Sequence, residues 1–196
     1  MPSSSAGRLE NLLGALQTAL SDSLTFEADS VVGHSGATAS ALTYLAQEPG
    51  LGIEQLKGPL GLSQSATVRL VDRLAVDGLL ERRPGNSGRA IAIHLTTAGE
   101  VVARQVLDRR HCVLRASLTP LDGPERAVLT TMLEKILSSI TAGPDHGERI
   151  CRMCDLDACP TPSCPVNLVA ERIGVESGEP TVPRSARPVT GRATLR

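Results

Sequence analysis

The 196-residue chain is poor in aromatic side chains, with one Phe, one Tyr and no Trp. Its core must therefore be built from aliphatic side chains, which suits the packing of helices. The same scarcity removes the ring platforms on which many proteins stack unpaired bases, and so argues against a binder of RNA or single-stranded DNA.

Long apolar runs are also missing. No stretch is apolar enough to span a membrane, and the N-terminus lacks the pattern of a signal peptide. We therefore expect a cytoplasmic protein without membrane contact, in which thiols stay reduced. The sequence has no Gly-rich phosphate loop, no nucleophile elbow and no arrangement of paired carboxylates. We accordingly expect a protein that is not an enzyme.

Residues 51–99 carry the most informative pattern. Residues 53–57 predict a short helix, which the Gly and Pro residues of 58–61 should end in a turn. Ser63 can cap a second helix, because its hydroxyl can accept a bond from a free backbone N–H. In that helix one face is apolar at spacings of three and four and should point inward: Ala66, Leu70, Val71 and Leu74. Residue types that bond base edges and phosphates form the predicted DNA-contacting set: Ser63, Gln64, Ser65, Thr67, Arg69 and Arg73.

A β-hairpin with a basic tip should follow. A strand begins near Leu79, residues 82–89 form the turn-rich tip, and the returning strand alternates, with Ile91, Ile93 and Leu95 expected inside. Arginine at such a tip can enter a minor groove, so Arg89 joins the predicted DNA contacts. Helix, turn, helix and ribbon in this order predict a winged helix-turn-helix, with one helix in the major groove. The alternative is a helix pair and hairpin used only for protein contacts.

Two segments, LGLSQSATVRLVDRLAVDGLLERR and HLTTAG, resemble the MarR family of bacterial transcriptional regulators. The resemblance covers about the first three quarters of the chain. It implies a homodimer that binds a double-stranded DNA operator, for which we expect a repressor role. It also implies a dimer interface made by the first and last helices, and a pocket for a small-molecule effector. Wings of this family commonly carry Asp-Arg-Arg; here Ser87, Gly88 and Arg89 stand at those positions, so only Arg89 carries over.

The predicted fold class is mainly α with a small β-wing, flanked by dimerisation helices at both ends. We expect the following organisation: an N-terminal dimerisation helix (1–30), the winged helix-turn-helix (31–99), C-terminal dimerisation helices (100–142), a Cys-rich metal-binding segment (148–173) and a disordered tail (174–196). Residues 141–147 are expected to be a linker. Asp122 and Glu125 resemble a capping box. The lone helical Cys112 is expected to be a buried small hydrophobe.

Four of the five cysteines lie in CRMCDLDACPTPSC, with the spacing C-x2-C-x4-C-x4-C: Cys151, Cys154, Cys159 and Cys164. In a reducing compartment this cluster predicts a metal site rather than disulfides. We favour structural zinc, because the spacing matches a zinc knuckle with Cys in place of its usual His. An iron–sulfur cluster is the main alternative, since Pro follows two of the Cys as in ferredoxin-like runs. A thiol–disulfide switch and four uncoordinated thiols are the other possibilities.

The metal–thiolate site would be strongly negative, so Arg152 and backbone N–H groups are expected to offset its charge. We also expect the Cys-rich segment to brace the last helix against the dimer partner. The main functional hypothesis is a DNA-binding regulator whose recognition helices shift with a ligand, metal or redox change. The second is a redox-sensing or electron-transfer protein that uses the winged helix as a scaffold.

Overall fold

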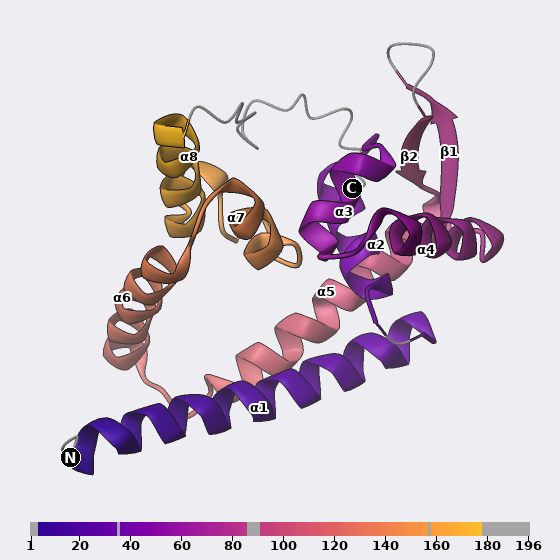
Figure 1. The fold of residues 1–196 in the computed structure, drawn as a ribbon. Helices are drawn as coiled ribbons and strands as arrows, with labels where there is room; N and C mark the ends of the chain where they lie inside the picture. The colour runs from indigo at the N-terminus through magenta and orange to yellow at the C-terminus, as the bar shows by residue number, and fades with distance from the viewer. Residues whose placement is uncertain (1–3, 35, 86–90, 157, 178–196) are drawn as a thin grey trace.

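The computed structural model describes residues 4–34, 36–85, 91–156 and 158–177 (Figure 1). This part of the chain is mainly helical and has one two-stranded antiparallel sheet, as the sequence predicts. The elements follow in this order: α1 (Ser4–Val32), α2 (Thr38–Gln47), α3 (Ile53–Leu60), α4 (Gln64–Val76), β1 (Leu80–Pro84), β2 (Ile91–Leu95), α5 (Thr97–Ser117), α6 (Gly123–Ile140), α7 (Pro144–Cys151), the 3-10 turn η1 (Thr161–Ser163) and α8 (Pro165–Ser177). None of the described helices combines the length and apolarity that crossing a membrane requires.

Helices α1 and α5 lie side by side and form a long arm, from which the lobe of residues 37–95 projects (Figure 1). Glu27 of α1 and Arg109 of α5 face each other across this contact, with 3.7 Å between Oε2 and Nη1. Thr96 caps α5, since its hydroxyl accepts the N–H of Gly99 at 3.1 Å. Helix α5 also packs against α2, so the arm and the lobe share one hydrophobic core.

The core of the lobe is aliphatic, as the composition predicts, except for the fully buried Tyr44. Its centre is α2, in which every residue from Thr38 to Leu45 is buried. The other fully buried apolar side chains of the lobe come from α2, α3, α4 and β2: Ala41, Leu42, Leu45, Leu56, Val71, Leu74 and Ile93. Helix α2 therefore has almost no face left for solvent.

Helix α3 is longer than the sequence indicated, because it runs through Gly58 and Pro59 to Leu60. Pro59 removes one backbone donor, but its ring is buried against the lobe, and this burial offsets the lost bond. The helix ends at Gly61, which adopts φ +64°, a left-handed conformation that favours Gly. Gly61 alone, rather than Gly58, Pro59 and Gly61 together, thus sets the turn before α4, the proposed recognition helix.

The wing pairs β1 with β2 from Leu80 opposite Leu95 to Pro84 opposite Ile91. The predicted alternation holds at Ile93 and Leu95, which are buried, but fails at Ile91, which is 58% exposed. Ile91 lies at the outer end of the ribbon, beyond the helices that cover the inner half. A bridge from Leu51 to Ile93 adds a short third contact at the base of the wing.

The C-terminal part is more ordered than predicted. Helix α7 begins at Pro144, inside the expected linker 141–147. Helix α8 continues to Ser177, past the expected start of the tail at residue 174, because Gly174 is buried. Residues 178–196, the rest of the expected tail, lie outside the described residues. Helix α8 packs on both α6 and α7, so the Cys-rich segment is part of a folded unit.

Two further expectations concern side chains on the long helices. The capping box of α6 is confirmed: Glu125 N–H donates to the Asp122 carboxylate and Asp122 N–H to Glu125, both at 2.9 Å. Cys112, expected to be buried, is exposed on α5.

We predict that Gly99→Ala destabilises the fold by about 2 kcal/mol, because overpacking forces the backbone to shift. A Cβ at Gly99 would lie 2.1 Å from the Leu79 carbonyl oxygen. Gly14→Ala is the control: nothing lies within 4 Å of its Cβ position, and the change should stabilise α1 by about 0.5 kcal/mol. Urea unfolding measures both, and equal stability of the two variants would contradict the predicted clash.

Candidate nucleic-acid interface and thiol cluster

Helix α4 begins as the sequence predicts. The Ser63 hydroxyl accepts the Ala66 N–H at 3.3 Å, which satisfies one of the free donors at the start of the helix. The inward face is confirmed for Leu70, Val71 and Leu74, all of which are buried. This packing holds α4 across the lobe with its opposite face in solvent.

The outward face of α4 matches the predicted contact set at Gln64, Ser65 and Arg69, which are exposed. Thr67 does not belong to this set, because it is fully buried and its hydroxyl donates to the Ser63 carbonyl at 3.0 Å. Thr67 lies three and four positions before Leu70 and Val71, which places it on the inward face. The spacing alone would have shown this, but the polar side chain suggested otherwise.

Arg73 is exposed, but one of its guanidinium N–H groups donates to the Thr38 hydroxyl of α2 at 3.0 Å. Because Thr38 is fully buried, this bond anchors the second half of α4 to the N-terminal end of α2. Arg73 thus has a structural contact as well as an exposed surface. No local sequence pattern indicates this contact, because the partner lies 35 residues away.

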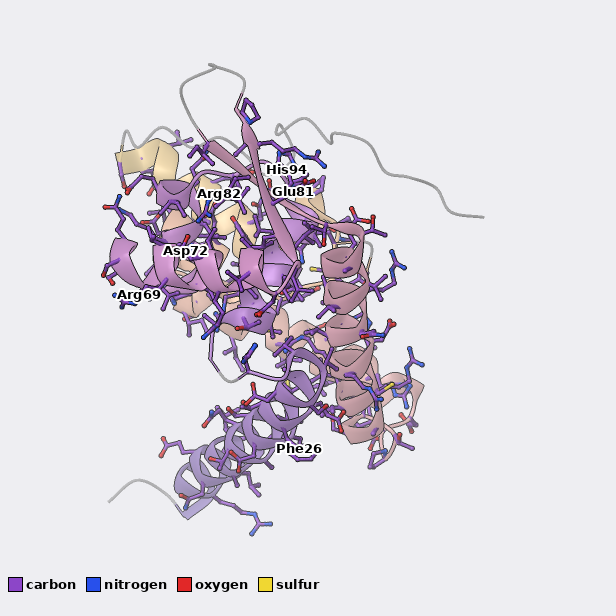
Figure 2. The ribbon with its side chains drawn as sticks, turned by 90° about the vertical axis from the view of Figure 1, so that its right-hand side faces the viewer. Phe26, Arg69, Asp72, Glu81, Arg82 and His94 are labelled. Atoms are coloured by element: carbon purple, nitrogen blue, oxygen red, sulfur yellow. The ribbon has the colours of Figure 1, made fainter. Side chains whose placement is uncertain are left out.

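The positive charge beside α4 is partly neutralised by neighbouring acids. Arg82 of β1 pairs with Asp72 of α4, and Arg83 pairs with Glu81. Figure 2 shows Asp72 and Arg82 on the same side of the lobe, with Arg69 farther along α4. Arg69 has no acidic partner within 4 Å in the described part of the chain. Arg89, the predicted wing contact, lies outside the described residues.

The second candidate site is the thiol cluster, which we define as Cys151, Cys154, Cys159 and Cys164. The structure brings these four side chains together. The Cys151 thiol hydrogen-bonds with Cys154 and Cys164, and Cys159 hydrogen-bonds with Cys164. Cys151 ends α7 and Cys164 directly precedes α8, so the cluster joins the two helices. All five cysteines of the chain are thiols without a disulfide.

Cys164 is more acidic than Cys151 and Cys159, because its pKa is lowered and theirs are raised. The hydrogen bond from Cys151 lowers the pKa of Cys164 to about 5, and the backbone N–H groups of Asn167 and Val166 at the start of α8 act in the same direction. Hydrogen bonding to Cys154 raises the pKa of Cys151, and burial raises that of Cys159 to about 11. Protons on the neighbouring sulfurs therefore stabilise one thiolate at the N-terminus of α8.

By residue type, four cysteine sulfurs are the ligand set of many structural zinc sites, and backbone N–H groups bond to Cys164. Within the described ranges, no group of three or more His, Cys, Asp or Glu side chains is arranged so that it could hold a metal ion. The sulfurs instead form a hydrogen-bonded group, which must lose protons before it binds a metal. Of the groups expected to offset the negative charge of a metal–thiolate site, the backbone N–H groups of Val166 and Asn167 bond to Cys164.

Arg152 was expected to offset charge at the sulfurs, but it makes its hydrogen bonds elsewhere. Its Nε donates to the Ser40 hydroxyl of α2 at 3.4 Å, and another guanidinium N–H donates to the Arg149 carbonyl. Burial lowers the pKa of Arg152, as do the nearby charges of Arg149 and Arg110. The side chain thus ties the Cys-rich segment to the lobe.

The geometry of the lobe agrees with comparisons to known proteins. A family model described as the MarR family matches residues 37–91. The winged-helix lobe is therefore similar to that of MarR-family proteins. It is 31% identical over 100 residues to the HTH-type transcriptional regulator PetP of Rhodobacter capsulatus, a match that covers 48% of this chain and 60% of PetP. The chain therefore spans less than two thirds of that relative.

Solved MarR-type structures extend the likeness beyond the lobe. A MarR family protein from Bacillus stearothermophilus superposes with a TM-score of 0.63 at 25% identity, over 72% of this chain and 99% of that one. A mutant MarR from E. coli, complexed with operator DNA, gives a TM-score of 0.52 at 23% identity, over 66% and 94% of the two chains. The MarR-type fold thus includes parts of the helical arm as well as the winged helix.

Proposed function

We propose that this chain is a sequence-specific regulator that binds double-stranded DNA through α4 and the wing and acts as a repressor. The observation that carries the proposal is the outward face of α4. It presents a cap hydroxyl, polar side chains and an unpaired cation, while the inward face is packed against the core. Such a helix can enter a major groove without losing its own packing. The complex of a mutant E. coli MarR with operator DNA supports this mode of binding.

Arg69 is the phosphate or base contact that we expect to matter most, because the nearby Arg82 and Arg83 already have acidic partners. An unpaired guanidinium contributes its full charge when it meets DNA, and each phosphate contact releases a bound counterion. We expect Gln64 and Ser65 to bond base edges, since both are exposed near the N-terminal end of α4.

We predict that Arg69→Ala weakens binding about tenfold at moderate salt, consistent with the loss of one charged contact worth about 1–3 kcal/mol. The probe is a fluorescent duplex that the protein itself selects from a random-sequence library, and anisotropy gives the dissociation constant. Arg115→Ala, an exposed arginine at the far end of α5, is the charge-matched control and should bind like the wild type. If no duplex is enriched, or if both variants bind equally, the interface is wrong.

We further propose a homodimer whose interface uses α1 and α6. Helix α6 has no buried residue, although it carries an apolar stripe that is about half exposed: Met132, Leu133, Ile136 and Ile140. The first half of α1 shows a second exposed row: Leu9, Leu12, Leu13 and Leu16. Exposed apolar rows of this extent usually mark interfaces, because a folded monomer gains by covering them. Two lobes held by such an interface would meet two half-sites of one operator.

We predict that Leu133→Glu on α6 converts the dimer to a monomer, because a charge at the centre of the interface would have to be desolvated. Analytical ultracentrifugation should show about half the mass of the wild type, and DNA affinity should fall with it. Thr131→Glu lies on the opposite face of the same helix and should remain dimeric. A monomeric wild type, or a dimeric Leu133→Glu variant, would exclude this interface.

We propose that the thiol cluster holds one metal centre, with zinc preferred and an iron–sulfur cluster as the alternative. The support is the convergence of four sulfurs and the N–H bonds to Cys164. A bound zinc would supply cross-linking of four points of the chain and no redox chemistry. A small-molecule effector stays a prediction that rests on the family resemblance alone.

We predict that the protein purified without oxygen contains one metal centre per chain, and that Cys159→Ser loses most of it, because a serine hydroxyl is a poor ligand for either centre. Elemental analysis and a visible spectrum measure this. About one zinc without colour supports the structural site, and iron with a visible band supports the cluster. Cys112→Ser should retain the full content, and metal-free wild-type protein would refute the site.

A further inference from the structure

The thiol cluster is docked on the winged-helix lobe through one face of α2. Ser40, Thr43 and Gln47 recur at spacings of three and four residues, so they lie on the same side of that helix. Each of them lies against the short turn that begins at Cys151 and ends at Cys154. Gln47 Nε2 donates to the Cys154 carbonyl at 2.5 Å. The Thr43 hydroxyl donates to the Ala39 carbonyl at 2.9 Å and also lies 3.4 Å from the Arg152 carbonyl.

The same turn is anchored by its side chains. The two residues between Cys151 and Cys154 are Arg152, which donates to the Ser40 hydroxyl, and Met153, which packs against the lobe's core. Helix α7 also packs on α3, where a Cβ at Gly61 would lie 3.6 Å from Arg149 Nε. The proposed metal-binding turn is therefore itself the surface that contacts the lobe.

The other half of the cluster is attached to α6 through α8. Cys164 directly precedes α8, and α8 packs on α6. Cys151, Cys164 and Val166 form a small buried core against which Leu137 of α6 packs. The four sulfurs thus lie between the lobe on one side and the helix with the exposed apolar stripe on the other.

A short path connects this turn to the recognition helix. Gln47 and Ser40 receive the Cys-rich turn along α2, and Thr38 at the start of the same helix accepts a bond from Arg73 of α4. Because α2 is buried along Thr38–Leu45, it can move only as a rigid piece. A displacement of the Cys151–Cys154 turn therefore either displaces α4 as well or breaks the hydrogen bonds of Gln47, Ser40 and Thr38.

We propose that the metal-loaded thiol cluster is a latch that fixes the lobe to α6, so that metal occupancy sets the affinity for DNA. The inference rests on the proposed function and names its regulation. With the metal bound, the C-x2-C turn is closed and presents Arg152 and Met153 to α2 in one geometry. Without it, the lobe samples other orientations, and only a fraction of dimers hold both recognition helices at the operator spacing. The apparent dissociation constant rises in proportion to the inverse of that fraction.

The experiment compares wild type, Gln47→Ala and Gln105→Ala, each metal-loaded and metal-depleted, on the duplex selected as above. Gln47 is only half-buried and is no thiol, so its loss should leave folding and metal content intact. Gln105, exposed on α5, is the matched control. We expect metal removal to weaken wild-type binding by about tenfold, on the assumption that about a tenth of lobes stay aligned. Metal-loaded Gln47→Ala should bind like metal-depleted wild type, and Gln105→Ala should bind like wild type.

Metal content and thermal melting are measured on every sample. A Gln47→Ala protein that keeps its metal and melting temperature but loses affinity supports the latch, even if metal-depleted wild type unfolds. A metal-loaded Gln47→Ala protein that binds like the wild type overturns it, as does a folded metal-depleted wild type with unchanged affinity. A chain that takes up no metal also overturns it. Failure to enrich any duplex is a different result, because it removes the proposed DNA binding itself.

Discussion

Helix α2 is buried from Thr38 to Leu45, and the polar groups within it need partners inside the protein. Thr43 donates within the helix, to the Ala39 carbonyl, but other partners come from distant segments: Arg73 of the recognition helix bonds to Thr38, and Gln47 bonds to the Cys-rich turn. Helix α5 packs on the same helix. Because an unmet buried polar group costs more than a normal hydrogen bond returns, these contacts resist separate displacement. The lobe, the arm and the thiol cluster are therefore linked through one helix.

The surface of the lobe combines a fixed framework with limited free charge. The arginines at the base of the wing are held by Asp72 and Glu81, so they orient the ribbon rather than add to a general positive field. Arg69 stays unpaired on the outward face of α4. A net charge of −1 for the whole chain fits this arrangement, because recognition would depend on a few placed groups. Exposed ion pairs of this kind contribute little to stability on their own.

A single chain leaves much of its apolar surface uncovered. Helix α6 buries none of its residues, although most of the stability of a helix in a protein comes from packing of its apolar face. It is held in the chain by α8 and by the core around the thiols. The proposed dimer and the proposed metal centre thus meet at the same helix. This proximity gives a physical reason for a Cys-rich addition on a winged-helix protein, because a local cross-link there affects both the interface and the lobe.

The sequence by itself determined the winged helix, because its signals are local: the Ser63 cap, the spacing of Leu70, Val71 and Leu74, and the hairpin pattern. It also predicted that Cys151, Cys154, Cys159 and Cys164 form one cluster, because their spacing and residue type are visible in the sequence. It misplaced Thr67, whose polar side chain outweighed its helical position, and it ended the C-terminal fold too early. Only the tertiary structure decided where the thiols lie. Their docking on α2 depends on bonds between residues more than 100 positions apart, which no local pattern encodes.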